Sequence, residues 1–274
     1  MQDTGERHIS NGNFNNKSEL YLHLMHIATY EYVKSFVADK KVLDFGCGSG
    51  YGTKILSETA ESVIGVDISP EAIHFAKREY PSSNLEFMMS EEIEDKKFDI
   101  ITSFQVIEHV SNDSEYIINL KKLLNPKGIL FISTPDKENR LFNHIQKPWN
   151  IFHLKEYSYN SLESLLKKHF RKVEVLKIGS DSDLIFEEIA RTKKQRNITL
   201  PATLVFYPNF LRIFLLKLQK RLFLFIKKLK SGPENFKKDN SAVISDSKYS
   251  YKDILFEKEL RHSTDLFVIS RNDE

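Results

Sequence analysis

The sequence predicts an α/β fold in which a doubly wound, mostly parallel sheet carries helices on both faces. Short, continuously apolar segments, beginning with KVLDF, alternate along the chain with amphipathic segments of helical length. Continuously apolar strands that alternate with helices are typical of a parallel sheet buried on both sides. The chain has 274 residues, of which 41% are apolar and 28% charged, so it can bury a substantial core without disulfide bonds.

Composition excludes several classes of protein. Cys47 is the single cysteine, which excludes an internal disulfide framework and suits a reducing compartment. The polar N-terminus lacks the apolar core of a secretory signal, and no uncharged apolar run approaches the roughly 20 residues of a membrane span. We therefore expect a cytoplasmic protein.

The first predicted element is a helix over residues 18–37, because apolar residues recur at helical spacing after Ser18, a residue type favoured at N-caps. Seven strands then follow, at residues 41–45, 62–67, 85–89, 98–104, 128–134, 172–178 and 265–270. The helices between them are predicted at residues 52–60, 69–80, 112–124 and 155–170. More than 80 residues separate the last two strands, and we interpret them as an insertion.

Residues 42–52, VLDFGCGSGYG, predict a glycine-rich loop between the first strand and the next helix. Glycine lets a backbone turn tightly and approach a ligand closely, so Gly46, Gly48 and Gly50 are candidate binding residues. A nicotinamide-binding G-x-G-x-x-G loop is excluded, because Tyr51 stands where the third glycine is required. A P-loop is excluded because no Gly-Lys-Ser/Thr follows. A turn that serves packing alone is the alternative.

This loop resembles the first motif, D-x-G-x-G-x-G, of class I S-adenosylmethionine-dependent methyltransferases, and later segments up to residue 135 resemble that family in order and spacing. The resemblance implies a Rossmann-like fold with an antiparallel last strand, and S-adenosyl-L-methionine as cofactor. It also implies that Asp67 accepts hydrogen bonds from the ribose hydroxyls and that Glu91 lies near the adenine amino group. The implied cofactor-binding residues are Asp44, Gly46, Cys47, Gly48, Gly50, Asp67, Ile68, Glu91 and Gln105.

Glu108 and His109 follow the fourth predicted strand, at the sheet edge where parallel α/β proteins bind ligands. Methyl transfer requires that the acceptor be aligned with the methyl group and relieved of its proton. Because an imidazole can take a proton from a hydroxyl group, we predict His109 as the catalytic base and place Glu108 in the catalytic site with it. The alternative is that His109 only hydrogen-bonds the backbone or packs on the cofactor. Cys47 is predicted to be a small loop residue, without a catalytic role.

A comparison with small-RNA 3′-terminal 2′-O-methyltransferases raises the question of a metal. That family holds a metal with an E-x-x-E-H motif and a later histidine. Here Gln105 replaces the first glutamate, which leaves Glu108, His109 and His153. Carboxylate and imidazole can form a metal site, but with one ligand lost we predict no metal.

The chain is also similar to bacterial members of the broad methyltransferase family found with surface-glycan synthesis. Residues 4–7, TGER, and residues 152–157, FHLKEY, match two elements of these proteins. The similarity implies O-methylation of a sugar, a glycan or a related small molecule, and implies that Glu6 and Arg7 fold over the cofactor or acceptor. A disordered leader is the alternative.

Residues 196–232 contain eight Lys or Arg and no acid. A basic amphipathic helix can lie on an anionic membrane surface, and one interpretation is peripheral membrane contact through residues 203–230, at the inner membrane. The alternative is that the apolar side of this helix packs on the protein core or on a second subunit in a homo-oligomer. No RNA-binding module is recognisable, so nucleic acid is not expected as a partner. At 100° per residue, one apolar stripe without charge is formed by Leu211, Phe214, Leu215, Leu218, Leu222, Phe225, Ile226 and Leu229.

These observations divide the chain into three predicted parts. Residues 1–40 form a leader and helix, residues 41–180 and 263–274 a methyltransferase domain, and residues 181–262 a basic helical insertion with a linker. Two other functions stay open at this point. They are an RNA 2′-O-methyltransferase and a partner subunit that binds the cofactor without catalysis.

Overall fold

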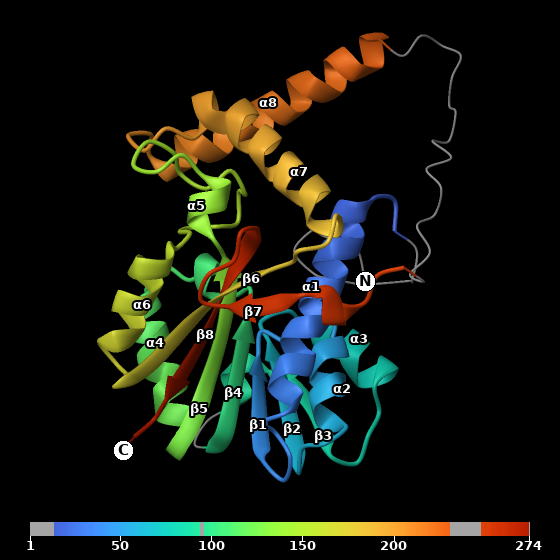
Figure 1. Ribbon diagram of the computed structural model, residues 1–274, viewed down its shortest axis with the longest axis vertical. Helices are drawn as coiled ribbons and strands as arrows, with labels where there is room; N and C mark the ends of the chain where they lie inside the picture. The colour runs from blue at the N-terminus through green and yellow to red at the C-terminus, as the bar shows by residue number, and fades with distance from the viewer. Residues whose placement is uncertain (1–13, 94–95, 231–247, 274) are drawn as a thin grey trace.

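The computed structural model describes residues 14–93, 96–230 and 248–273. One sheet runs in the order β3-β2-β1-β4-β5-β8-β6-β7, with helices on both of its faces (Figure 1). Strands β1 to β5 pair in parallel, and β8 is antiparallel to both β5 and β6. The predicted α/β fold class and the antiparallel last strand are therefore confirmed.

The strands coincide closely with the predicted apolar segments, with one addition. They are β1 (Lys41–Phe45), β2 (Ser62–Asp67), β3 (Leu85–Met89), β4 (Phe98–Phe104), β5 (Leu124–Pro135), β6 (Lys172–Gly179), β7 (Leu255–Glu257) and β8 (Ser263–Arg271). The sheet has eight strands where seven were predicted, because β7 is only three residues long and carries no readable alternation. It pairs with the end of β6 and lies within the segment predicted as an insertion.

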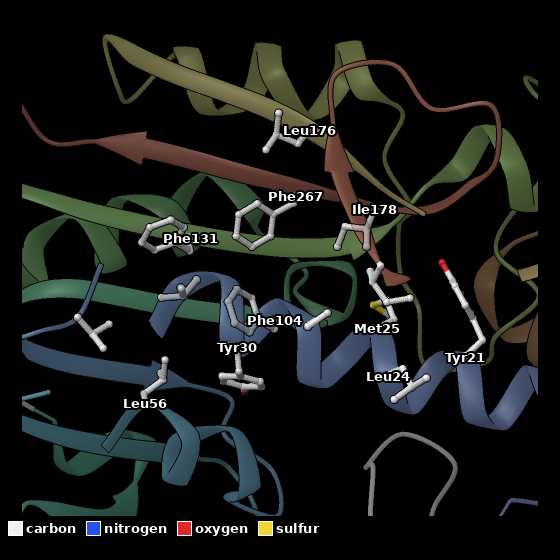
Figure 2. Close-up of a cluster of buried hydrophobic side chains, with 14 of the residues drawn as sticks. Tyr21, Leu24, Met25, Tyr30, Leu56, Phe104, Phe131, Leu176, Ile178 and Phe267 are labelled. Atoms are coloured by element: carbon white, nitrogen blue, oxygen red, sulfur yellow. The ribbon is translucent and has the colours of Figure 1, made fainter. Parts of the chain in front are cut away.

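Two helical layers cover the sheet. The helices are α1 (Lys17–Lys34), α2 (Tyr51–Ser57), α3 (Pro70–Glu79), α4 (Asp113–Leu123), α5 (Lys137–Arg140), α6 (Tyr159–Lys167), α7 (Leu184–Thr199) and α8 (Asn209–Lys230). Consecutive strand residues point to opposite faces, so Val42 packs in the cluster under α1 and α2 whereas Leu43 packs in the cluster under α4 and α6. Figure 2 shows the first cluster, in which α1 side chains face Phe104, Phe131 and Phe267 of the sheet.

Two helix starts differ from the sequence prediction. The N-cap of α1 is Asn16, whose side chain accepts a hydrogen bond from the Glu19 amide, so the prediction of Ser18 as cap was wrong. Ser18 instead donates to Glu188 of α7. Helix α6 begins at Tyr159, not at residue 155, because Ser158 caps it through the Ser161 amide.

Helix α8 confirms the helix predicted from the basic, amphipathic segment. Its first turns pack on the protein through Arg212 and Leu216, which are buried, whereas most of the predicted stripe is exposed. The far end of α8 extends away from the sheet (Figure 1). None of the helices in the described part of the chain is long and apolar enough to cross a bilayer. The predicted cover by Glu6 and Arg7, and residues 231–247 of the predicted insertion and linker, lie outside the described residues.

Candidate active site

A pocket of about 550 Å³ opens at the carboxyl ends of β1, β2 and β4. The sequence-predicted residues that line it are Gly46, Cys47, Gly48, Asp67, Ile68, Gln105 and His109. The predicted residues Asp44, Gly50, Glu91 and Glu108 do not line this pocket. The structure therefore brings most of the candidate site together and places the others behind it or beside it.

The glycine loop needs its glycines for two different reasons. Gly46, Gly48 and Gly50 all have positive φ, of 85°, 55° and 84°. A Cβ atom on Gly46 would lie 2.4 Å from Cγ2 of Val106, and one on Gly50 would lie 2.8 Å from the Phe87 ring. A Cβ atom on Gly48 would meet no described atom within 4 Å. Packing thus requires Gly46 and Gly50, whereas Gly48 is required only by its backbone angle and leaves the pocket open.

Asp44 lies behind the loop and holds it in place. Its carboxylate is fully buried and accepts hydrogen bonds from Thr53 Oγ1 at 2.7 Å and Thr102 Oγ1 at 2.8 Å, as well as from the Tyr30 hydroxyl. Burial raises the pKa of Asp44 to about 6, and these hydroxyl donors partly counter the rise. Asp44 therefore joins β1, α1, α2 and β4 directly beneath the pocket.

Asp67 closes β2 and reaches the pocket wall. Its Oδ2 accepts a hydrogen bond from the Gly48 amide at 3.0 Å, and its Oδ1 accepts one from the Ser69 amide at 2.9 Å. These two main-chain donors fix the Asp67 carboxylate beside the glycine loop. A carboxylate oxygen can accept more than one hydrogen bond, so Asp67 can also bind a ligand diol. Ile68 beside it is 81% exposed and supplies an apolar rim.

Three other predicted residues take distinct positions. Burial raises the pKa of the Cys47 thiol, which keeps it protonated, as suits a small loop residue. Gln105 has a positive φ of 57° and donates from Nε2 to Asp265 Oδ1 at 3.1 Å. Glu91 is exposed on the 3₁₀ turn Ser90–Glu92, and it is Ser90 of that turn that lines the pocket.

His109 ends the 3₁₀ turn Ile107–His109 that follows β4. Its Nδ1 lies 3.2 Å from the carbonyl oxygen of Phe152. A carbonyl oxygen can only accept, so Nδ1 carries the proton in this contact and Nε2 is the basic nitrogen. The imidazole lines both the first pocket and a second pocket next to it. A general base must lie at such a boundary, within reach of the ligands on both sides.

Glu108 is 1% exposed and lies behind His109. Its Oε2 accepts a hydrogen bond from Thr134 Oγ1 at 2.9 Å, whereas its Oε1 has no partner among the described residues. Burial raises the pKa of Glu108 to about 7, and nearby His153 limits the rise. The carboxyl group can therefore exchange a proton near neutral pH.

His153 lies next to His109, and the two rings pack edge to face with centroids 4.8 Å apart. The Nδ1 of His153 lies 2.9 Å from Glu156 Oε1, and Glu156 also accepts from Arg140 Nε at 3.3 Å. Burial alone would raise the pKa of Glu156, but the Arg140 guanidinium and His153 together outweigh burial and the pKa is lowered. Glu156 is thus an anion that orients His153.

One atom each of Glu108, His109 and His153 lies within 4.8 Å of the others, which is close enough for a shared metal ion. Gln105, which stands where the compared RNA-modifying family has a further carboxylate, directs its amide group to Asp265 and Ser133. The three residues are therefore a metal set with one carboxylate fewer than that family provides.

The second pocket has a volume of about 410 Å³ and shares His26, Gln105 and His109 with the first. Most of its lining side chains are ionisable or carry an amide, and Leu22, Met25, Pro135 and one indole ring add apolar surface. The further ionisable, amide and indole residues of this pocket were not predicted from the sequence, because they come from the start of α1, from α5 and the loop after it, from α7 and from β8, and no local motif connects them. They are Asn16, Glu19, Arg140, Trp149, Asn150, Glu188, Arg191 and Asp265.

Comparison with known proteins agrees with this architecture. The family model described as "Methyltransferase domain" matches residues 24–193, which is more than half of the chain. A "Probable S-adenosylmethionine-dependent methyltransferase" of Mycolicibacterium smegmatis is 29% identical over 173 residues, covering 62% of this chain and 65% of that protein. A protein of the same description from Mycobacterium tuberculosis is 30% identical over 167 residues, with 60% and 58% covered. The aligned part thus spans less than two thirds of these relatives.

A ubiquinone biosynthesis O-methyltransferase of Pasteurella multocida is 35% identical over 111 residues, covering 35% of this chain and 46% of that protein. Among solved structures, the [4+2]-cyclase SpnF has a TM-score of 0.52 at 15% identity and covers 97% of this chain and 88% of its own. The YcgJ protein of Bacillus subtilis has a TM-score of 0.50 at 17% identity, with 90% and 98% covered. At such identities these structures show the fold alone.

The first pocket also fits the cofactor of this family. It offers the fixed carboxylate of Asp67 for a ribose diol, the apolar side chains of Phe45, Ile68 and Val106 for a flat base, and open space at Gly48. Its volume of about 550 Å³ is in the range of small-molecule sites. The chain accordingly belongs to the methyltransferase-domain family, and its cofactor is S-adenosyl-L-methionine.

Proposed function

We propose that this protein transfers a methyl group from S-adenosyl-L-methionine to a hydroxyl oxygen of a sugar or a related polyhydroxylated small molecule. The cofactor supplies an activated methyl group when it is bound in the first pocket. The acceptor occupies the second pocket, which adjoins the first at His109 and Gln105. This arrangement gives each ligand its own pocket and a shared boundary where the methyl group passes.

One observation carries the choice of acceptor. Glu108 Oε1 and Trp149 Nε1 are buried atoms without a hydrogen-bond partner in the described part of the chain, and both residues line the second pocket. Buried polar atoms are normally hydrogen-bonded, because leaving one unpaired costs about 1–3 kcal/mol. A hydroxyl group can donate to the ionised Glu108 carboxylate or accept from its protonated form, and it can accept from an indole N–H. A molecule with several hydroxyl groups would therefore satisfy both atoms.

His109 is the proposed base. Its Nδ1 faces the Phe152 carbonyl oxygen, which leaves Nε2 as the nitrogen that accepts the hydroxyl proton. His153, held by Glu156, limits the positions that the His109 ring can take, since the two rings are in edge-to-face contact. The chain thus contributes alignment of the acceptor and removal of its proton, the two requirements of an in-line displacement.

A transfer assay tests this function. Purified protein and S-adenosyl-L-methionine with a radiolabelled methyl group are incubated with separate pools of sugars and nucleotide sugars, lipids, and RNA. We expect label only in the sugar pool, and label resistant to mild base, as an ether is. Label in RNA would replace the proposal with the RNA-methylating alternative. Cofactor binding without label in any pool would favour the non-catalytic partner subunit.

A further inference from the structure

Helix α8 extends away from the sheet at its far end (Figure 1), and several of its apolar side chains are exposed to solvent. Four members of the predicted stripe, Phe214, Leu218, Leu222 and Phe225, are each 50–60% exposed. Side chains of this size and number on one helix are not explained by packing within the described part of the chain. They form what we call the apolar stripe of α8.

Cations flank this stripe. Lys217 and Arg221 lie beside the stripe on one side, whereas at 100° per residue Lys220 lies on the opposite face of the helix, and all three are exposed. The sequence of α8 contains seven Lys or Arg and no Asp or Glu. A helix surface that combines exposed apolar side chains with a net positive charge is complementary to lipid headgroups of negative charge over an apolar interior.

The base of α8 is fixed to the active site. Arg212 is fully buried, and its guanidinium donates to the carbonyl oxygens of Pro148, Asn150 and His153. Asn150 and His153 line the second pocket. Helix α8 is therefore held rigidly against the loop that shapes the proposed acceptor site.

We propose that α8 docks the protein on the surface of an anionic membrane, with the apolar stripe inserted between headgroups and the flanking cations on the lipid charges. A nucleic acid would engage the cations but leave the stripe in water. A second copy of α8 would bring two uncompensated positive charges together. Helix α8 is not long and apolar enough to cross a membrane, so the proposed contact is with the membrane surface. This inference is independent of methyl transfer.

Vesicle flotation tests the proposal with the full chain. The protein is mixed with vesicles of phosphatidylcholine alone or of phosphatidylcholine with phosphatidylglycerol, at low and high salt. We expect flotation only with the anionic vesicles, weakened by salt. The double variant L218E/L222E should lose binding at least about tenfold, and K217E/R221E should lose at least about thirtyfold, since each cation near an anionic surface contributes about 1 kcal/mol.

The matched control is I118E, which replaces an exposed isoleucine on α4, away from α8. It should bind vesicles as the parent does. Binding of S-adenosylhomocysteine by calorimetry shows that each variant is folded. No flotation of the parent, or equal flotation of the parent and L218E/L222E, would overturn the proposal. So would a dimer in size-exclusion chromatography that the same double variant dissociates, or RNA binding that depends on the stripe.

Discussion

The amide nitrogen of Gly48 lies 3.0 Å from Oδ2 of Asp67, so the residue that closes β2 also holds the glycine loop. We expect Asp67→Ala to weaken S-adenosylhomocysteine binding by about 10- to 100-fold, because hydrogen bonds to a charged group contribute about 1.5–3 kcal/mol. Asp67→Asn, which keeps one acceptor oxygen, should bind S-adenosylhomocysteine with an affinity between those of the parent and Asp67→Ala. Calorimetric titration measures both, and Glu61→Ala, an exposed carboxylate at the other end of β2, is the control. Unchanged affinity in Asp67→Ala would remove Asp67 from the cofactor site.

The contact between His109 and the Phe152 carbonyl oxygen leads to a second prediction. His109→Ala should lower kcat by about 10²–10⁴-fold, the usual contribution of a general base, while S-adenosylhomocysteine affinity stays within about twofold. His109→Gln keeps a similar volume and polarity but cannot act as a base, so it should be equally slow. Recovery of the rate in the glutamine variant would show that His109 only positions its surroundings.

Much of the sheet and the cofactor pocket could be predicted from local sequence. The apolar segments at β1, β2, β3 and β4 and the glycine loop between β1 and α2 are each contiguous, so their signals lie within a few residues. Strand β7 was missed because it is short and is fixed by pairing with β6, which lies more than 70 residues earlier.

The second pocket could not be predicted in the same way. Asn16, Trp149, Glu188 and Asp265 come from four distant parts of the chain and meet only because α1 and α7 pack together beside β8. Asp44 shows a different limit. Its motif predicts a cofactor residue, but it is buried behind the loop and bonded to three hydroxyl groups, which come from α1, α2 and β4.

Metal removal provides a third prediction. Gln105 turns its amide to Asp265, so the set of Glu108, His109 and His153 lacks a fourth side-chain ligand among the described residues. We expect prolonged treatment with EDTA to change the methyl transfer rate by less than about twofold, since a metal-dependent site would lose most of its activity. Activity lost on chelation and restored by Mn²⁺ or Zn²⁺ would contradict this and favour the RNA-methylating alternative.

The raised pKa of Glu108 predicts how stability depends on pH. The native state keeps the proton up to about pH 7, whereas the unfolded state releases it near the ordinary value of 4.5. The native state thus binds the extra proton between these values, and the contribution of Glu108 to the free energy of unfolding falls as pH rises through that window, by about 3 kcal/mol.

Glu108→Gln removes this titration while keeping an oxygen for the Thr134 hydroxyl. Urea unfolding at pH 5 and pH 8 should therefore show a smaller loss of stability with rising pH in the variant than in the parent. Asp44 and Asp265, whose pKa values burial raises to about 6, titrate in both proteins and cancel in the comparison. An identical pH dependence in the two proteins would mean that Glu108 is not protonated in the native state.

Trp149 distinguishes a polar acceptor from an apolar one. Its Nε1 is buried without a partner in the described chain, and its ring lies 4.3 Å from the Arg140 guanidinium. Trp149→Phe keeps an aromatic ring and deletes the donor. If an acceptor hydroxyl binds Nε1, KM for the acceptor should rise about tenfold, because one hydrogen bond contributes about 1 kcal/mol and an unpaired partner costs more. The affinity for S-adenosylhomocysteine should not change, because Trp149 lines only the second pocket. Tyr159→Phe, which deletes a donor outside both pockets, is the matched control and should leave KM unchanged. A KM for the acceptor that is the same in Trp149→Phe as in the parent would place the acceptor elsewhere.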